Sequence, residues 1–232
     1  MYVCFVGISG AGKTTTAKET VDILESKYNL SAISGTPFFR KERSKFYRFF
    51  WLIYIWRFYN RKIVSFYRKY TTSGSLYSHA SLKEAVYAWY RPLMYKYRLF
   101  QLSSRNVDVL VDDEPFFAFS IEAYKKGDLT KSELLSFFNR QIRPVCSTML
   151  IVWVNVPVTV AIQRRLERDI VGVQSIEKVK KTKEDKKEVV SVIENISEDI
   201  SLIEIDSTKK IEVNAKFVAK EAYYLLSKAS QL

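Results

Sequence analysis

Short apolar runs alternate along the chain with longer segments in which apolar residues recur every three or four positions. The runs are rich in Val, Ile and Leu, which is typical of strands buried on both faces of a parallel sheet. The periodic segments are typical of helices that cover such a sheet. We predict strands at Tyr2–Val6, Ser31–Ser34, Asp108–Val111, Met149–Asn155 and Ser201–Ile205. We predict helices at Thr14–Lys27, in one or two segments within Lys45–Tyr70, and at Ser81–Leu102, Lys131–Gln141, Val158–Arg168, Glu184–Asn195 and Val213–Lys228.

The alternation of predicted strands and helices indicates an α/β fold with a parallel sheet. Each pair of consecutive parallel strands needs a crossover, and a helix packed on one face of the sheet usually provides it. We therefore expect three layers, with five parallel strands between flanking helices. The 232 residues are enough for one such domain, and we predict a single domain over 1–232 with a helical acceptor or interface region at about 37–104. A lid region is predicted at about 164–190, and its polar, lysine-rich part from Gly172 to Lys187 is predicted to be a mobile loop or the edge of the lid.

The loop after the first predicted strand carries the first chemical signal. It reads GISGAGKTT, and its spacing fits the phosphate-loop pattern G-x-x-x-x-G-K-[ST] between a strand and a helix. Glycines allow successive backbone N–H groups to converge on phosphate oxygens at the positive end of the following helix. We expect Lys13 to reach the β- and γ-phosphates and the Thr14 hydroxyl to ligate Mg²⁺. The stretch predicts a site for ATP and Mg²⁺ in a P-loop NTPase fold, formed by Gly7, Gly10, Ala11, Gly12, Lys13, Thr14 and Thr15.

Three acidic residues follow the third predicted strand, in VDVLVDDEPFF. The carboxyl ends of parallel strands border the crevice in which such sheets bind ligands. A carboxylate at this position helps to hold the Mg²⁺ of a phosphate loop, and we expect Asp112 to be that ligand. The same group could instead be the base that accepts the proton of an acceptor hydroxyl. Asp113 and Glu114 are expected to face the acceptor.

A group of arginines follows the fourth predicted strand, in MLIVWVNVPVTVAIQRRLERD. Arg164 and Arg168 are four residues apart, so they would share one face of a helix. Beside a triphosphate they would clamp the transferring group and stabilise its negative charge. Arginines on a helix are more often a solvated face, but the order strand, proline, helix, arginines recurs in P-loop kinases and favours the functional role.

Four stretches together resemble the thymidylate kinase-like family of P-loop nucleoside and nucleotide kinases: GISGAGKTT, YAWYR, VLVDDEPF and VNVPVTVAIQRRLER. The resemblance extends over nearly the full length of the chain. It implies transfer of the ATP γ-phosphate to a small-molecule acceptor, which in that family is a nucleoside monophosphate. It also implies that Tyr87 stacks on the acceptor base and that Arg91 meets the acceptor. The loop that includes Ser207 and Thr208, between the last strand and the last helix, would lie near the adenine.

Two stretches differ from the family where the acceptor's phosphate would be held. The family usually has Arg-Glu-Pro after the second strand and Asp-Arg-Tyr after the third, whereas this chain has Gly35-Thr36-Pro37 and Asp112-Asp113-Glu114. A hydroxyl acceptor on a nucleoside, sugar or lipid-linked compound is therefore the alternative, unless a residue such as Arg40 supplies the missing contact. A further alternative is an ATPase or NTPase coupled to nucleic acid, because an apolar strand that ends in Asp-Glu also occurs in such enzymes.

Most of the net charge of +12 lies in one segment, residues 37–71, which has ten Lys and Arg against one acidic residue. The same segment contains fourteen aromatic residues. We favour burial or a homodimer interface through residues 45–102, because part of the segment is apolar on all sides. Peripheral contact of residues 38–70 with an anionic membrane is the second interpretation. Binding of nucleic acid is disfavoured.

The cysteine and histidine content argues against a disulfide framework or a zinc site. Cys4, Cys146 and His79 are the only such residues, and their spacing is not that of metal ligands. No apolar run approaches the roughly 18 residues that a transmembrane helix needs. Because the first predicted strand begins at residue 2, we expect no signal peptide. The sequence thus favours a cytoplasmic protein, with membrane association at most at its periphery.

Overall fold

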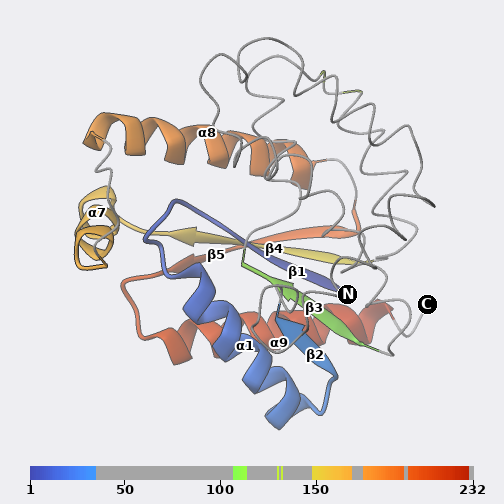
Figure 1. Cartoon of the computed structure of the whole chain (residues 1–232). Coiled ribbons are helices and arrows are strands. Elements are labelled where there is room, and N and C mark those ends of the chain that lie inside the picture. Colours follow the sequence, from blue (N-terminus) through green and yellow to red (C-terminus); the bar gives the residue numbers. More distant parts are fainter. Residues whose placement is uncertain are drawn as a thin grey trace, which may run out of the picture.

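The computed structural model describes residues 1–34, 107–113, 130, 132, 148–168, 175–195 and 198–229 (Figure 1). The strands are β1 (Tyr2–Val6), β2 (Ala32–Ser34), β3 (Val109–Asp112), β4 (Met149–Asn155) and β5 (Ile200–Asp206). The helices are α1 (Lys13–Tyr28), α7 (Val158–Leu166), α8 (Ile176–Glu194) and α9 (Ile211–Ala229). The predicted helices within 45–70 and at 81–102 lie outside the described residues, as does the one at 131–141 apart from Ser132.

The five strands form one sheet in the order β2-β3-β1-β4-β5. Every neighbouring pair is parallel, so the predicted α/β fold with a five-stranded parallel sheet is confirmed. The central strand β1 pairs with β3 on one side and β4 on the other, and Val3 lies opposite both Val111 and Leu150. Since all strands run the same way, the segments that leave β1, β3, β4 and β5 do so at one edge of the sheet.

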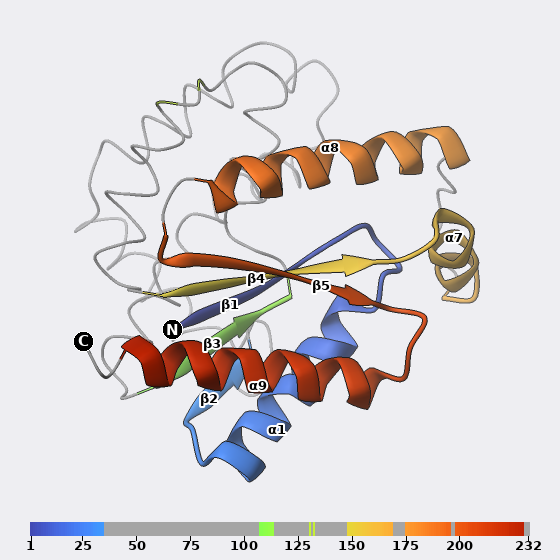
Figure 2. The ribbon, with the colours of Figure 1, turned by 180° about the vertical axis from the view of Figure 1, so that it is seen from behind.

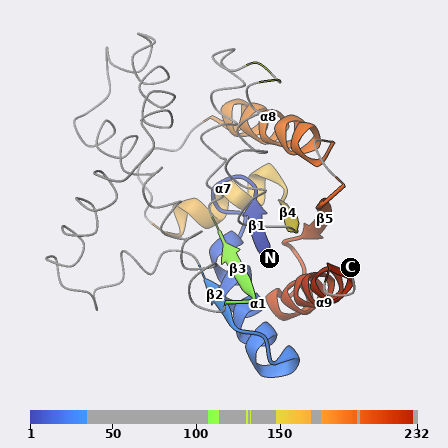
Figure 3. The same ribbon diagram turned by 90° about the vertical axis from the view of Figure 1, so that its right-hand side faces the viewer.

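The helices cover both faces of the sheet and give three layers. Figure 1 and Figure 2, seen from opposite sides, show α8 over one face and α1 and α9 over the other. The end-on view in Figure 3 shows the same separation, with the strands between α8 and the pair of α1 and α9. Helix α7 lies at the edge where β4 ends. Among the helices that the structure describes, none combines the length and the apolar character needed to cross a membrane.

Alternation of side chains along each strand divides the buried residues between the two faces. Val3 and Phe5 of β1 belong to a cluster with Leu24 of α1 and Val218 of α9. Cys4, which lies between Val3 and Phe5 in the sequence, is equally buried and points to the opposite face, which α8 covers. A sheet that is buried on both faces explains why its strands are continuous apolar runs in the sequence.

Strand β3 is shifted by one residue from the prediction, and the shift changes the site. We predicted Asp108–Val111, but the strand runs from Val109 to Asp112, and Asp112 pairs with Cys4 of β1. Because side chains alternate with a period of two, inclusion of Asp112 in the strand fixes the face to which its carboxylate points. Asp113 is then the first residue beyond the strand.

Helix α8 corrects the prediction of a mobile loop at Gly172–Lys187 for the residues from Ile176 onward. The helix begins at Ile176, eight residues before the predicted start, and the Oγ of Ser175 caps it by accepting a hydrogen bond from the Lys178 backbone N–H at 3.3 Å. Its lysines and glutamates are good helix formers, and Val179 and Ile193 are buried beneath them. The loop prediction was wrong because a high lysine content is also compatible with the solvent face of an amphipathic helix.

Helix α7 is shorter than predicted. It ends at Leu166, and the backbone N–H of Arg168 bonds to the carbonyl of Arg165 in the turn that follows. Arg168 lies beyond the helix and is exposed, whereas Arg164 is half-buried within it.

Candidate nucleotide-binding site

The phosphate-loop sequence forms a tight turn between β1 and α1. Gly10 and Gly12 both have φ of +86°, a left-handed conformation that side chains other than glycine rarely adopt. Gly12 is the N-cap of α1, and the backbone N–H of Ala11 bonds to the Ile8 carbonyl at 3.2 Å within the turn. The loop therefore delivers the N–H groups of the first turn of a helix to the carboxyl edge of the sheet.

Two glycines of the loop are also required by the close approach of neighbouring backbone. A Cβ on Gly7 would lie 2.8 Å from the carbonyl oxygen of Val154 in β4. A Cβ on Gly10 would collide with the carbonyl oxygen of Ala161 in α7. The loop is thus packed directly against β4 and α7.

Lys13 folds back over the loop. Its half-buried Nζ donates to the carbonyl of Ile8 at 2.9 Å and to that of Gly7 at 3.2 Å. The ammonium group therefore lies on the same turn whose N–H groups would bind phosphate. Thr15 is exposed one residue beyond Thr14, in the first turn of α1.

Asp113 and Asp112 have different partners. The hydroxyl of Thr14 donates to Oδ2 of Asp113 at 2.6 Å, which joins the end of the phosphate loop to the residue after β3. The Asp112 side chain is fully buried, and its Oδ2 accepts a hydrogen bond from the Tyr2 hydroxyl at 3.1 Å. The residue expected to share a metal with Thr14 was Asp112, whereas the carboxylate that contacts Thr14 is that of Asp113.

The Thr14 hydroxyl and the Asp113 carboxylate fit the chemistry of a magnesium site. Both supply the hard oxygen ligands that Mg²⁺ prefers, and Mg²⁺ usually takes only one or two carboxylates and completes its shell with water and substrate phosphates. In the described part of the chain, His, Cys, Asp and Glu side chains form no cluster of three that could hold a metal ion by itself.

Arg164 of α7 also lies near the start of α1. Its guanidinium donates to the Ser207 hydroxyl at 3.1 Å and to the Ser207 carbonyl at 3.0 Å. The same group is 3.9 Å from the position of a Cβ on Gly12. Arg164 thus lies between the start of α1 and the loop from β5 to α9, and it brings together two parts of the site that are far apart in the sequence.

The loop from β5 to α9 is organised around Asp206. The Asp206 carboxylate accepts hydrogen bonds from the Thr208 hydroxyl at 2.7 Å and from the Thr208 backbone N–H at 2.9 Å. The hydroxyl, then the backbone N–H and the nearby charge of Lys209 lower the pKa of Asp206 below its ordinary value of 3.8. The Asp206 carbonyl accepts from the buried Asn214 side chain of α9 at 2.7 Å, which fixes the loop to the last helix.

Two lysines of α8 reach the edge of the sheet, and sequence reasoning did not find them. Lys183 Nζ donates to the Val156 carbonyl at 2.7 Å, and Lys186 Nζ donates to the Gly7 carbonyl at 3.1 Å. Their spacing of three residues places them on one helical face, which was a usable signal. The prediction of a loop over this segment obscured the signal.

The structure brings together the loop residues from Gly7 to Thr15, Asp113, Arg164 and Ser207 with Thr208. Other predicted site residues fall elsewhere. Asp112 lies buried behind Asp113, and Arg168 lies beyond α7. The predicted acceptor residues Arg40, Tyr87, Arg91 and Glu114 lie outside the described residues.

Comparison with known proteins gives similar structures but no sequence family. No protein-family model matches the chain, and the search of curated proteins finds no match. Three solved structures of a deoxyadenosine kinase from M. mycoides are similar to this chain. The structure with the products dCMP and a flexible dCDP has a TM-score of 0.49 and 14% sequence identity, over 95% of this chain and 98% of that one. The structures with dCTP and dATP cover the same shares at 15% identity, with TM-scores of 0.49 and 0.48. A likeness of this strength carries no conclusion about activity, so the fold rests on the sheet and the helices described above.

Proposed function

We propose that this protein is an ATP-dependent phosphotransferase of the P-loop kinase type. The observation that carries the proposal is the meeting of Thr14 and Asp113 at 2.6 Å, beside a phosphate loop whose Lys13 lies on its own turn. A phosphate-binding loop joined to a carboxylate at a strand end is the arrangement needed to bind a nucleoside triphosphate with its magnesium ion.

The loop residues would hold the polyphosphate. Backbone N–H groups at the start of α1 donate to phosphate oxygens, and Lys13 moves from the loop carbonyls to the β- and γ-phosphates. Mg²⁺ supplies neutralisation of the phosphate charge when it is bound. The Thr14 hydroxyl donates a hydrogen bond to Asp113 at 2.6 Å, so Asp113 would orient Thr14 as a ligand of Mg²⁺.

Arg164 and Asp112 receive different roles from those predicted. Arg164 contacts Ser207 in the loop from β5 to α9, which was expected to lie near the adenine. This contact favours a role for Arg164 near the nucleobase over a role at the transferring phosphoryl group. Full burial of Asp112 beneath the site favours a supporting role over direct proton transfer, because an acceptor hydroxyl must come within hydrogen-bond reach of its base.

For the acceptor, we propose a hydroxyl group, with nucleosides as the first class to test and a nucleoside monophosphate as the competing acceptor. The carboxylate of Asp113 stands where the thymidylate kinase-like family has an arginine. A carboxylate repels an anionic acceptor, whereas it does not repel a neutral hydroxyl. The similar solved structures are of a kinase named for deoxyadenosine, and we include this nucleoside in the panel as one member among several.

The test is acceptor-dependent release of ADP from ATP and Mg²⁺. The panel holds deoxynucleosides, ribonucleosides, thymidine monophosphate, other nucleoside monophosphates and sugars. We expect turnover with at least one nucleoside and little with thymidine monophosphate. Robust turnover of thymidine monophosphate would overturn the acceptor assignment, and ADP release that is equally fast without any acceptor would favour an NTPase.

A pair of lysine variants on one helix controls the assay. Lys13→Ala should lower the rate by about a hundredfold or more, because it removes a charge that stabilises the transferring group. Lys18→Ala removes the same charge from the exposed side of α1 and should leave the rate within about twofold. If Lys13→Ala kept the wild-type rate at saturating ATP, the phosphate loop would not be the site of transfer.

A further inference from the structure

Two lysines from different parts of the chain bond to the same carbonyl oxygen in the phosphate loop. Lys13 Nζ lies 3.2 Å from the Gly7 oxygen, and Lys186 Nζ lies 3.1 Å from it. The two residues are far apart in sequence, and Lys186 comes from α8, on the opposite face of the sheet from α1. A single carbonyl that accepts from two ammonium groups holds these cations within a few ångströms of each other.

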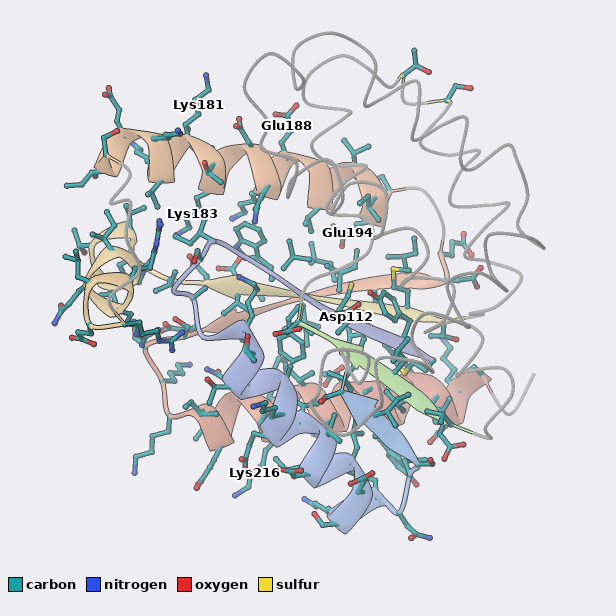
Figure 4. The ribbon with its side chains drawn as sticks, in the orientation of Figure 1. Asp112, Lys181, Lys183, Glu188, Glu194 and Lys216 are labelled. Atoms are coloured by element: carbon teal, nitrogen blue, oxygen red, sulfur yellow. The ribbon has the colours of Figure 1, made fainter. Side chains whose placement is uncertain are left out.

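Packing and hydrogen bonding hold helix α8 in the position from which Lys186 reaches the Gly7 carbonyl. Val179 and Val190 are buried on its inner side, and Lys183, one turn before Lys186, bonds to the Val156 carbonyl at the end of β4. Figure 4 shows Lys183 on the side of α8 that faces the sheet and Lys181 on the side turned away from it. Lys186 is half-buried, as Lys183 is, whereas Lys181 is exposed.

The orientation of the Gly7 peptide matters for phosphate binding. A phosphate loop binds anions through N–H groups directed into the turn, so its carbonyls must be held outward. Lys13 donates hydrogen bonds to the carbonyls of both Gly7 and Ile8 in this structure. The same ammonium group would have to leave these carbonyls to contact the β- and γ-phosphates of a bound nucleotide. A carbonyl that loses a charged donor loses a strong hydrogen bond, and this cost would oppose nucleotide binding.

We infer that Lys186 is a positioning residue of the phosphate site, which keeps the Gly7 carbonyl bonded when Lys13 transfers to the polyphosphate. The inference rests on the proposed function and adds α8 to the machinery of the site. The ammonium group of Lys186 also repels that of Lys13 where both bond to the Gly7 carbonyl, and binding of a polyphosphate relieves this repulsion. The group recognised is the polyphosphate, whatever base is attached to it.

The experiment measures the dissociation constants of ATP and of inorganic tripolyphosphate by calorimetry. Lys186→Gln should raise both by about tenfold or more, which corresponds to the loss of one charge-assisted hydrogen bond. Lys181→Gln removes the same charge from the exposed side of the same helix, and it should change them by less than about twofold. Lys186→Arg keeps a charged donor and should stay within about threefold of the wild type. The melting temperature of each variant is recorded, so that loss of folding is recognised.

A double-mutant cycle with Lys13 separates positioning from general electrostatics. In a Lys13→Met background there is no ammonium to release from Gly7, so Lys186→Gln should change the affinity by less than about threefold. An equal effect of Lys186→Gln in both backgrounds, or no effect in the wild-type background, would overturn the inference and leave the proposed kinase intact. Absence of any binding of ATP or tripolyphosphate to the wild-type protein would overturn both.

Discussion

Asp112 and Asp113 are neighbours in the chain but lie in different environments. Asp112 ends β3 with its carboxylate buried against the Tyr2 hydroxyl, and Asp113 follows the strand and accepts from Thr14. The two adjacent carboxylates therefore differ in environment. The direction of the Asp112 side chain is set by the alternation of side chains along β3, whereas Asp113 lies beyond the strand. At the scale of single residues, the end of the strand decides which acid takes part in the site.

The loop around Asp206 offers a residue-scale prediction about pH. Removal of the hydroxyl in Thr208→Val should raise the pKa of Asp206 toward 3.8, because the hydroxyl is the largest cause of its lowering. The measurement is an NMR titration of the Asp206 carboxyl carbon in wild type and variant. Lys209→Gln is the matched control, and it should shift this pKa less than Thr208→Val does, because the charge of Lys209 contributes less.

The sign of the corresponding effect on stability follows from the lowered pKa. A carboxyl whose pKa is lowered in the folded state stabilises the fold above its ordinary pKa, and this contribution is lost as the pH falls through the folded value. Thr208→Val should therefore show a smaller loss of stability than wild type on acidification below pH 3.8. A larger shift from Lys209→Gln than from Thr208→Val would show that charge, and not the hydrogen bond, controls Asp206.

At the scale of elements, α8 differs most from what the sequence predicted. Its outer side is charged, while Val179, Val190 and Ile193 are buried beneath it. The same helix carries Lys183 and Lys186 to the strand ends. Burial of its apolar side thus fixes the position of two cations at the candidate site.

A pair of isoleucines in α8 tests whether the helix is packed. Ile193 is fully buried and Ile176 is 61% exposed. Ile193→Ala should lower the free energy of unfolding by about 2–4 kcal/mol, because it leaves a cavity under the helix. Ile176→Ala, with the same chemical change on the exposed side, should lower it by about 0.5 kcal/mol or less. The measurement is chemical denaturation of both variants, and equal effects would contradict the packed position of α8.

At the scale of the whole molecule, most of the net charge of +12 lies in a segment outside the described residues. Residues 37–71 carry ten of the 37 basic residues together with fourteen aromatics. The predicted homodimer interface at 45–102, the predicted membrane contact at 38–70 and the disfavoured contact with nucleic acid all stay predictions.

Sedimentation with lipid vesicles distinguishes the two favoured interpretations of this segment. We expect the protein to stay in the supernatant with anionic vesicles, because the apolar run from Phe49 to Trp56 fits burial in a core or an interface. Ile53→Asp should then give monomer or aggregate in analytical ultracentrifugation. Co-sedimentation that is released by salt would favour the membrane instead, since attraction to the surface is screened over about 10 Å at 0.1 M salt.

The sequence by itself determined the elements that depend on local order. Strands buried on both faces must be apolar throughout, so β1 and β4 were predicted with the bounds that the structure has. The phosphate loop was equally readable, because the left-handed turns at Gly10 and Gly12 need glycine and because the following helix starts at the next residue. These features depend on residues that are close together in the chain, so a single sequence is enough to predict them.

The tertiary structure decided the contacts between segments that are far apart in the chain. The choice of Asp113 over Asp112 for Thr14 depends on where β3 ends relative to β1, and a difference of one residue reverses it. The bonds from Arg164 to Ser207 and from Lys186 to Gly7 depend on how α7 and α8 pack against the sheet. Such packing is set by burial of the apolar sides of several elements at once, so no local pattern in the sequence could specify it.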